Sequence, residues 1–470
     1  MVNRQLRILQ VSTFDIAGGA ENVASNLFRS YRARGHSSWL AVGYKRGKDP
    51  DVIPIPRINH RGPWSRFWLS FEKQLHAFEG IGYALSRTLL RTIANPLEEL
   101  GPRFGLEDFN HPGTHRLLEL VPNKPDIVHC HNLHGGYFDL RFIPWLSQQV
   151  PLVLTLHDAW LLSGHCHHSF GCERWKTGCG HCPDLTIYPS IQRDATAHNW
   201  RRKREIYAKS NLYLATPSRW LMQEVEQSML APTVAEARLI PNGVDLSVFH
   251  PSDKQVVREA LNILHDAKVL LFTSNRIRQH RAKDYQTMRS AVALVADRLA
   301  GQSLLFIALG EEAAAERIGQ AEIRFVPYQK DPEMVARYYQ AADIYIHAAR
   351  AENFPTTVLE ALACGTPVVA TAVGGIPEQV KALEMAGAEW RMGNLNRYGT
   401  NEATGVLVPP GDARGMALGI ERLLKDHSLS RRLGENAARD ARTRFDLQRQ
   451  VSDYLRWYEE LLCARNRAAH

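Results

Sequence analysis

Glu352-Asn-Phe-Pro-Thr-Thr-Val-Leu-Glu360 is the stretch that decides the fold, because it lies between two apolar runs of strand length, Asp343–His347 and Pro367–Thr371. Pro355 stands where a first helical residue is tolerated, since the N–H that proline lacks would have no partner there. The stretch therefore predicts a strand, a helix and a second strand, the repeating unit of parallel sheets covered by helices.

The same alternation continues along the chain in two series of similar size. The first series predicts strands at 7–12, 38–43, 126–130, 152–156, 212–216 and 237–240, and the second at 268–273, 304–308, 323–326, 343–347, 367–371 and 405–408. Turn residues in Pro241-Asn-Gly-Val-Asp245 separate the two series. We therefore expect an α/β protein with two facing Rossmann-like, doubly wound domains and a ligand cleft between them.

The expected domain boundaries follow from this break. An N-terminal domain covers residues 1–240 and includes a helical insert at 60–105 and a Cys-rich loop at 163–184. A C-terminal domain covers residues 241–440, and a helical segment covers 441–470.

Composition and charge exclude several classes of protein. The 470 residues are too many for one hydrophobic core, and 57 Lys plus Arg against 49 Asp plus Glu give a formal net charge of +8. This small surplus favours anionic partners, among them nucleotide phosphates, and excludes a histone-like composition. No apolar run reaches the roughly 18–20 residues of a membrane-spanning helix, and the apolar segment after Arg7 is too short for a signal peptide. We therefore expect a cytoplasmic protein with reduced cysteines.

The helix start in the 352–360 stretch suits a polyhydroxylated anion. Backbone N–H groups around Phe354–Thr357 and the helix dipole attract negative charge, while Glu352 and Glu360 offer carboxylates to sugar hydroxyls. For a single glutamate, a solvent-facing position on a helix is the commoner explanation. The complete string of loop, helix, glycine and strand makes a ligand site the better hypothesis.

The Glu-x7-Glu spacing of this stretch resembles the donor-binding motif of the retaining glycosyltransferases of family four, which have the two-domain GT-B fold. Three further stretches match in the expected order, namely Ile16–Glu21, Ile240–Asp245 and Val373–Glu378. The string from His157 to Pro183 is similar to the branch that builds bacterial exopolysaccharides of the colanic-acid kind. The segment from Leu447 to Leu462 resembles the family's closing helix, which returns to the N-terminal domain.

The resemblance implies roles for residues around the donor. Glu352 would face the donor sugar, Glu360 the ribose of the nucleotide, and His131 would lie beside the sugar. Gly19, at a helix N-terminus, would let the backbone approach the donor phosphate. The predicted donor-binding residues are Gly18, Gly19, Asn353, Phe354, Pro355, Thr356 and Glu360.

The resemblance also implies a cationic pair that neutralises the departing diphosphate. We assign it to Arg276 and Lys283, although Arg278 and Arg281 compete and Asp284 stands where the family has a glycine. With these cations no catalytic metal is expected, and the leaving phosphate itself would help to deprotonate the acceptor. The predicted catalytic residues are His131, Glu352, Arg276 and Lys283, and the predicted acceptor-binding residues are His157 and Asp158.

Four cysteines lie close together in the sequence of the Cys-rich loop: Cys166, Cys172, Cys179 and Cys182. Reduced thiols at this density predict a structural zinc site, although only Cys179-x2-Cys182 has the tight spacing of zinc knuckles. The alternative is four reduced, partly buried thiols without a metal.

The helical insert carries an aromatic stripe made of Trp64, Trp68, Phe71, Leu75 and Phe78. Such a stripe usually packs on its own domain. Basic residues beside it, such as Arg66 and Lys73, also suit a peripheral membrane contact.

These features predict a retaining glycosyltransferase that moves a sugar from a nucleoside-diphosphate donor to a glycan acceptor, lipid-linked by expectation, in exopolysaccharide or related synthesis. It would work in the cytoplasm, in contact with the inner face of the membrane, and would not bind nucleic acid. One alternative is a GT-B nucleotide-sugar epimerase, which needs no acceptor. A second is a zinc-stabilised nucleic-acid binder, to which Arg174, Lys176 and Arg201–Arg204 give slight support.

Overall fold

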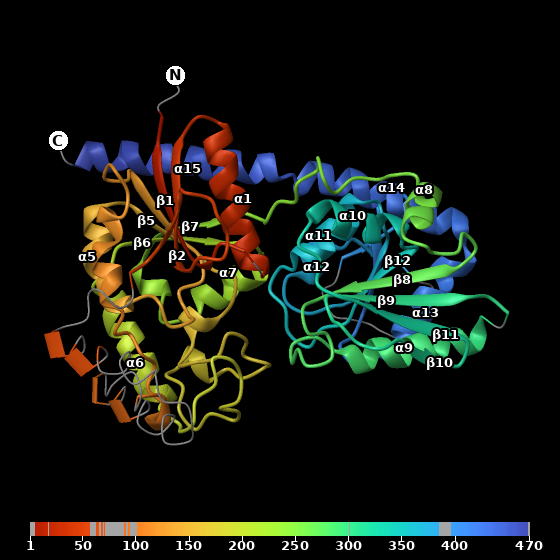
Figure 1. Cartoon of the computed structure of the whole chain (residues 1–470), viewed down its shortest axis with the longest axis horizontal. Helices are drawn as coiled ribbons and strands as arrows, with labels where there is room; N and C mark the ends of the chain where they lie inside the picture. Colours follow the sequence, from red (N-terminus) through yellow and green to blue (C-terminus); the bar gives the residue numbers. More distant parts are fainter. Residues whose placement is uncertain are drawn as a thin grey trace. The chain divides into compact units, whose positions relative to one another are not determined.

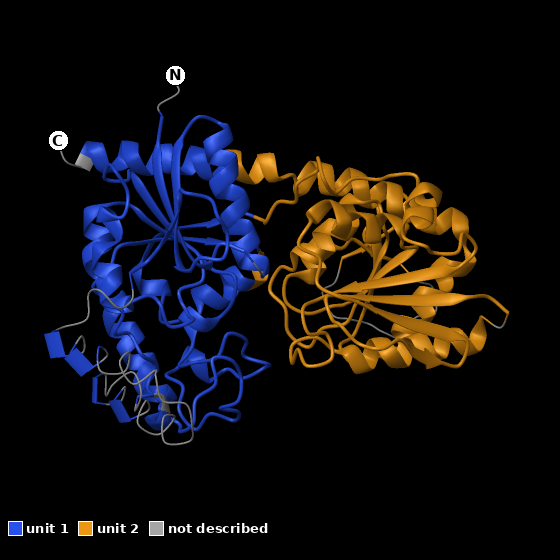
Figure 2. Cartoon of the chain, in the orientation of Figure 1, with its two compact units in different colours: residues 1–217, 221–240, 453–470 blue, residues 218–220, 241–452 orange. Residues whose placement is uncertain are grey.

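A computed structural model describes residues 5–16, 18–56, 63–64, 67–68, 70, 89–90, 93–94, 101–299, 301–384 and 396–468. The chain divides into two compact units, which Figure 2 shows in different colours. Unit 1 comprises residues 1–217, 221–240 and 453–470, and unit 2 comprises residues 218–220 and 241–452.

Unit 1 is built on a sheet that has seven strands among the described residues, in the order β3-β2-β1-β4-β5-β6-β7, and every neighbouring pair is parallel. The strands are β1 (Arg7–Phe14), β2 (Ser37–Tyr44), β3 (Val52–Pro54), β4 (Ile127–Cys130), β5 (Leu152–Thr155), β6 (Leu212–Thr216) and β7 (Val234–Leu239). All residues of β4 and β5 are buried, as expected for central strands of a parallel sheet covered on both faces.

The helices of unit 1 bury the apolar stripes that their sequences predict. They are α1 (Gly19–Ala33), α5 (Ile143–Gln149) and α6 (Thr196–Tyr207), with short 3-10 turns η1 (Pro102–Phe104), η2 (Pro112–Glu119), η3 (Leu140–Phe142), η4 (Trp160–Leu162), η5 (Arg174–Lys176) and η6 (Ala231–Thr233). Helix α1, for example, buries Leu27, Phe28 and Tyr31. Helix α7 (Arg219–Glu226) begins in unit 2 and continues in unit 1.

The C-terminal helix α15 (Leu447–Ala468) begins in unit 2, and from Asp453 onward it belongs to unit 1. There it buries Tyr454, Trp457 and Tyr458 completely. The Tyr458 hydroxyl and His129 Nδ1 share a hydrogen bond of 2.7 Å, as do the hydroxyls of Tyr454 and Thr155. These polar contacts fix the end of the chain against β4 and β5.

Unit 2 is built on a sheet with nine strands among the described residues, in the order β10-β11-β9-β8-β12-β13-β16-β14-β15. Within it only β10 and β11 pair antiparallel. The strands are β8 (Lys268–Thr273), β9 (Leu304–Leu309), β10 (Glu316–Ile318), β11 (Ala321–Val326), β12 (Ile344–His347), β13 (Val368–Thr371), β14 (Ala382–Leu383), β15 (Arg397–Tyr398) and β16 (Gly405–Val408).

Figure 1 shows α9 and α13 on one face of the unit 2 sheet and α10 and α11 on the other. The helices of this unit are α8 (Lys254–Ala260), α9 (Tyr285–Arg298), α10 (Pro332–Ala341), α11 (Thr356–Ala363), α12 (Ile376–Gln379), α13 (Ala413–Lys425) and α14 (His427–Arg444). One continuous core fills the space between sheet and helices. The α/β class predicted from the sequence is therefore confirmed, with one doubly wound sheet in each unit.

Each sheet changes its winding direction at one point. In unit 1 the chain winds outward from β1 to β2 and β3, then returns to place β4 on the other side of β1. In unit 2 it winds outward from β8 to β9 and β11, then places β12 on the other side of β8. Ligands of doubly wound sheets bind outside the carboxyl ends of the strands at such switch points. The candidate ligand positions are therefore β1/β4 in unit 1 and β8/β12 in unit 2.

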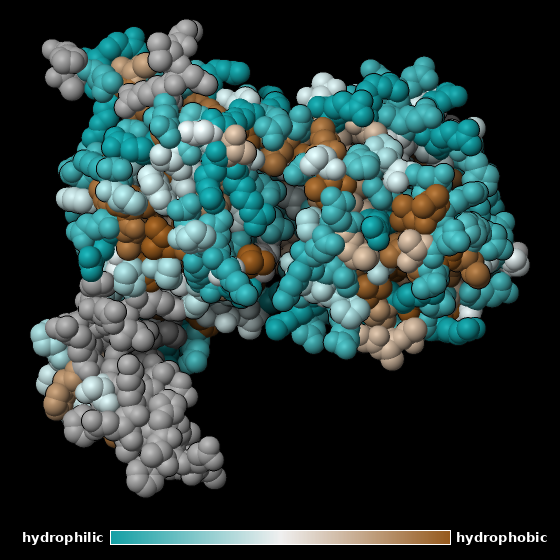
Figure 3. All heavy atoms as spheres, turned by 45° about the horizontal axis from the view of Figure 1, so that its top comes forward, coloured by the Kyte–Doolittle hydropathy of each residue, from teal (hydrophilic) through white to brown (hydrophobic). Residues whose placement is uncertain are grey.

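Hydrophilic residues cover most of the face shown in Figure 3. Of the aromatic stripe in the insert, Trp64 and Trp68 lie with their ring centroids 5.8 Å apart, whereas Phe71, Leu75 and Phe78 lie outside the described residues. None of the helices in the described ranges is long and apolar enough to cross a membrane.

Candidate active site

The switch point of unit 2 brings together two predicted residues, Lys283 and Glu352, and a histidine that was not predicted, His347. Lys283 lies in the loop after β8, where its backbone forms an isolated antiparallel bridge with Ala349, just beyond β12. Its ammonium group forms an ion pair with Glu352, and both side chains are nearly buried, with 11% and 13% exposed. His347, the last residue of β12, lies with Nε2 3.4 Å from both Glu352 Oε1 and Lys283 Nζ. Sequence reasoning assigned Lys283 and Glu352 but missed His347.

Burial determines the charges in this cluster. It lowers the pKa of Lys283 to about 7, so the positive charge of Lys283 depends on an anionic partner. It also lowers the pKa of His347 well below the usual value, an effect to which the charge of Lys283 adds. His347 is therefore neutral, and the Tyr345 hydroxyl lies 3.0 Å from its Nδ1. The cluster therefore contains one carboxylate, Glu352, and one cation, Lys283, and each neutralises the charge of the other.

The loop from Glu352 to Pro355 is held by close backbone packing. The backbone oxygen of Asn353 accepts from Gly375 N at 2.7 Å, and its side-chain oxygen accepts from Ser218 at 2.9 Å. A Cβ atom on Gly374 would lie 1.7 Å from the backbone oxygen of Glu352, and Gly374 has φ of +56°. Only glycine fits there, which explains the Gly-Gly pair of the predicted motif.

Helix α11 starts directly after this loop. Pro355 precedes Thr356, the first helical residue, with φ of −63°, and Phe354 is buried against Phe445. The first-turn amides of α11 have no partners within the helix, and the helix dipole makes this end positive. The described loop therefore presents donors for an anion or for sugar oxygens, as the sequence predicts.

Glu360 lies one turn further along α11 and is partly buried. Its Oε2 accepts a hydrogen bond of 2.8 Å from the Tyr339 hydroxyl. Burial raises the pKa of Glu360 to about 7, while the hydrogen bond from Tyr339 opposes this rise. A carboxyl group at this pKa can accept hydrogen bonds from ribose hydroxyls at little cost in solvation. Tyr339 and Tyr345 escaped sequence reasoning, because their contacts arise only when α10 and β12 pack.

The loop after β8 contains several arginines that could bind the diphosphate, and two of them, Arg276 and Arg278, differ in their surroundings. Arg278 Nε donates to Glu311 Oε1 at 2.6 Å, so its charge is already neutralised. Arg276 is exposed and has φ of +52°, a conformation that non-glycine residues rarely adopt outside functional or tight-turn positions. This contrast favours Arg276 as the phosphate ligand.

Asp284 occupies the position where the family has a glycine, and the structure gives it a structural role. It is the N-cap of α9 and accepts from Thr287 N at 3.3 Å. Its Oδ2 also lies 3.3 Å from Arg350 Nε. The departure from the family pattern therefore stabilises the helix start after Lys283.

The switch point of unit 1 begins with the Gly-Gly turn. Gly18 precedes Gly19, the first residue of α1, and has φ of +87°. The turn requires glycine for its conformation, whereas a Cβ on Gly18 would meet only the end of the Glu21 side chain, 2.2 Å from Oε2.

His131 and His157 form a buried chain of hydrogen bonds at the ends of β4 and β5. His131 Nε2 donates to Gln10 Oε1 at 2.7 Å, and His157 Nε2 donates to His131 Nδ1 at 2.9 Å. Burial lowers the pKa of His131 well below the usual value and that of His157 to about 4, so both rings are neutral. Both nitrogens of His131 thus have partners inside unit 1. Its predicted contact with a donor sugar stays a prediction.

His134 and Asp158 form a neighbouring pair, of which only Asp158 was predicted. His134, in the segment after β4, has Nε2 2.8 Å from Asp158 Oδ2. The Nδ1 atom of His134 is buried and has no hydrogen-bond partner in the described structure. Burial raises the pKa of the Glu21 carboxyl, and the charges of His134 and Asp158 also act on it. Sequence reasoning assigned Asp158 but neither His134 nor Glu21, although all three follow the carboxyl ends of adjacent parallel strands.

The described structure gives no support to the zinc site that the cysteine spacing predicts in the Cys-rich loop. Among the described residues, no group of three or more His, Cys, Asp and Glu side chains is arranged to hold a metal ion. Cys179 Sγ instead accepts a hydrogen bond from Gly164 N at 3.3 Å, and His165 Nε2 lies 3.4 Å from Cys182 Sγ. Burial raises the pKa of the Cys166 thiol to about 11 and that of Cys179 to about 12. All four cysteines of the loop are free thiols.

Hydrogen bonds to the start of α6 help to fix this loop. Asp194 Oδ2 accepts from Cys182 N at 2.7 Å, and Thr196 Oγ1 accepts from Gly180 N at 2.9 Å. The indole of Trp200 donates to Trp175 O at 2.8 Å.

Two doubly wound sheets of this kind are the architecture of the GT-B fold. The family model described as Glycosyltransferase Family 4 matches residues 17–248, and the model described as Glycosyl transferases group 1 matches residues 253–440. The chain belongs to glycosyltransferase family 4, whose members are retaining enzymes that use nucleotide-sugar donors. The family resemblance seen in the sequence is thus confirmed.

Individual relatives agree with this assignment. WcaC of Escherichia coli K12, named for colanic acid biosynthesis, is 25% identical over 386 residues, which cover 78% of this chain and 83% of WcaC. D-inositol 3-phosphate glycosyltransferase 1 of Catenulispora acidiphila is 28% identical over 277 residues, which cover 56% of this chain and 59% of that protein. The crystal structure of Anabaena HepE in complex with UDP and glucose matches with a TM-score of 0.59 at 16% identity, over 97% of this chain and all of HepE.

Proposed function

We propose that this enzyme transfers a sugar from a nucleoside-diphosphate sugar to a glycan acceptor in the synthesis of a surface polysaccharide. The observation that carries the proposal is the Lys283–Glu352–His347 cluster at the switch point of unit 2, next to the start of α11. The cation and the helix-start amides suit the diphosphate of such a donor, and the carboxylate suits the hydroxyls of its sugar.

Donor binding would break the ion pair between Lys283 and Glu352. The diphosphate is the stronger anion and would take over Lys283, together with Arg276. Glu352 would then be free to accept hydrogen bonds from the sugar, while Glu360 accepts from the ribose. Each half of the ion pair thus holds the other in a nearly buried position until the donor replaces it.

In this proposal the enzyme's groups act through positioning and charge stabilisation. Arg276, Lys283 and the amides of the 352–356 loop stabilise the charge that develops on the departing diphosphate. Gly18 and Gly19 let the start of α1 approach a phosphate, and Asp158 contacts the acceptor. His157 and His131, both neutral, are hydrogen-bonded to each other, and His157 precedes Asp158 in the chain. No metal takes part in these steps.

The similarity to WcaC supports a glycan acceptor of the exopolysaccharide kind, and an acceptor of this kind is carried on a lipid at the cytoplasmic face of the membrane. Exposed apolar side chains of the insert support contact with such a membrane: Trp64 is 61% exposed, Phe67 55% and Leu89 61%.

A thermal-shift screen with UDP-, GDP- and ADP-sugars tests the proposal, followed by turnover of the donor that stabilises the protein most. We expect one donor class to raise the melting temperature and the Glu352→Ala variant to lose turnover. Glu402→Ala is the matched control, because Glu402 is exposed in the same unit. Absence of stabilisation by every nucleotide sugar would contradict the proposal.

A further inference from the structure

We propose that Glu21, His134, Asp158 and Tyr188 form a subsite for an uncharged sugar ring of the acceptor, an inference that builds on the function proposed above. Glu21 follows β1, His134 follows β4 and Asp158 follows β5, and these three strands are neighbours in the unit 1 sheet. Their carboxyl ends flank the switch point, where the fold leaves room for a ligand.

The hydrogen-bonding groups of this subsite match a hydroxyl group. His134 Nε2 binds Asp158 Oδ2 at 2.8 Å, which leaves the buried Nδ1 as the nitrogen without a partner. Burial opposes protonation of His134, but the charge of Asp158 outweighs it and raises its pKa. His134 Nδ1 is thus an unpartnered polar atom, and the carboxylate of Glu21, which acts on His134 electrostatically, offers acceptor oxygens. A sugar hydroxyl can bind to both groups, because it donates as well as accepts.

An aromatic surface borders these polar groups. The ring of Tyr188 is 52% exposed, and its centroid lies 5.6 Å from that of His134. The ring of Trp160 approaches His134 from another side, with centroids 5.7 Å apart. The negative face of an aromatic ring attracts the C–H bonds on the flat face of a sugar. Polar groups beside an exposed tyrosine face are therefore the combination that recognises a carbohydrate.

The charges around the subsite disfavour a phosphorylated ligand. Two carboxylates, Glu21 and Asp158, act on the cluster electrostatically, and His134 is bound to Asp158. Arg46 is the nearby arginine, and its guanidinium lies 3.9 Å from the centroid of the Phe14 ring, with an N–H directed to the Ile16 carbonyl. Lys203 and His167 also act on the cluster electrostatically, but Lys203 is paired with Glu107. Of these cations, Lys203 is thus bound to a carboxylate, and the exposed Arg46 lies over the Phe14 ring.

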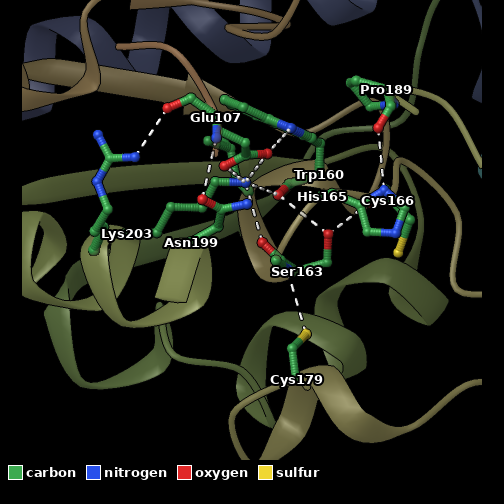
Figure 4. A network of polar contacts seen from close by, with 12 residues as sticks. Glu107, Trp160, Ser163, His165, Cys166, Cys179, Pro189, Asn199 and Lys203 are labelled. Carbon is green, nitrogen blue, oxygen red and sulfur yellow. Dashed lines mark hydrogen bonds and ion pairs between the residues drawn. The ribbon is translucent and has the colours of Figure 1, made fainter. Parts of the chain in front are cut away.

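A buried network fixes the loop that carries Asp158 (Figure 4). Lys203, on α6, is completely buried and donates to the backbone oxygens of Trp160 and Ser163 at 3.0 and 3.1 Å. It also donates to Glu107 Oε1 at 3.0 Å, which in turn accepts from the Trp160 indole at 2.7 Å. The Trp160 amide donates to Asp158 Oδ1 at 2.9 Å. The subsite therefore rests on a rigid support rather than on a loose surface loop.

Binding of simple sugars, measured without any nucleotide, tests this inference. The probes are methyl β-D-glucoside, methyl β-D-galactoside and methyl α-D-mannoside, with glucose 6-phosphate as the charged probe. We expect saturation-transfer NMR to detect at least one methyl glycoside and its addition to shift the His134 imidazole resonance, assigned by its loss in His134→Gln. Glucose 6-phosphate should not shift that resonance at the same concentration.

Variants with matched controls locate the binding. Tyr188→Ser and Glu21→Gln should each weaken glycoside binding at least about tenfold, whereas Tyr328→Ser and Glu205→Gln, at exposed positions elsewhere, should not. The hydrogen bonds at Tyr188 from His167 go to its backbone oxygen, so the serine variant keeps them. No detectable glycoside binding, equal effects of test and control variants, or a stronger His134 shift with glucose 6-phosphate would each overturn the inference. None of these readings depends on the donor, so they are separate from a failure of the proposed function.

Discussion

Lys203 carries a positive charge into the interior of unit 1, and its replacement by methionine is the sharpest test of how the loop after β5 is held. The lysine is 0% exposed and its partner Glu107 is 8% exposed. Lys203→Met would leave the Glu107 carboxylate buried without its cation. Breaking one partner of a buried ion pair costs about 3–5 kcal/mol of folding free energy, which exceeds the effect of most single substitutions.

The expected loss corresponds to a lower melting temperature of unit 1 by about 10 °C, because about 1 kcal/mol shifts the melting temperature of a unit of this size by about 2–4 °C. Differential scanning calorimetry and urea unfolding measure it. The double variant Lys203→Met/Glu107→Gln should recover part of the loss, since a neutral amide can still accept from the Trp160 indole. Lys209→Met, at an exposed position just after α6, is the matched control.

A Lys203→Met protein that melts within about 1–2 °C of the wild type would refute this reasoning, because an unpaired buried carboxylate should cost more. A double variant less stable than Lys203→Met alone would refute it as well. Either result would mean that the loop is held mainly by packing around Trp160 and not by the buried charge.

Three further predictions concern other parts of the chain. Burial raises the pKa of Glu360 to about 7, above its unfolded value, so its contribution to stability should be present in acid and fall as the pH rises toward 7; melting curves of Glu360→Gln against pH should lack this decrease. Gly374→Ala would place a Cβ 1.7 Å from the Glu352 carbonyl oxygen and should abolish the thermal shift with nucleotide sugars, whereas Gly399→Ala, with open space around it, should not. Trp64/Trp68→Ser should weaken liposome flotation if the insert contacts membranes, and unchanged flotation, as expected for the control Trp145→Ser, would exclude that role.

The donor motif could be predicted because its chemistry is contiguous. Glu352, Pro355 and Glu360 lie within one loop and one helix, so their spacing defines their arrangement once the flanking strands are recognised. His347 ends a predicted strand next to this loop, and the rule that ligands bind at carboxyl ends could have found it. Tyr339 comes from another helix, and no local pattern connects it to Glu360.

The hydrogen-bond partners of the histidines in unit 1 could not be predicted from the sequence for a related reason. Three histidines, His129, His131 and His134, follow one another in and after β4, and the family resemblance assigned a ligand only to His131. Their roles differ because Tyr458 and Gln10 occupy the first two, while Asp158 binds only one nitrogen of the third. These partners are between 24 and 329 residues away in the chain.

The cysteine spacing predicts a common metal, and the described residues give that prediction no support. The loop turns through glycines and through Cys179 itself at positive φ. Backbone hydrogen bonds to Asp194 and Thr196 help to fix it.

Calorimetric titration of two variants in unit 2 tests the central claim most directly, namely that the Lys283–Glu352 pair separates to bind the two parts of the donor. The ligands are the complete nucleotide sugar identified by the thermal-shift screen and its nucleoside diphosphate. Lys283→Met should weaken both ligands at least about tenfold, the loss expected for one charge-assisted contact. Glu352→Gln should weaken the nucleotide sugar but not the nucleoside diphosphate. Wild-type affinity of both variants for both ligands would contradict the account.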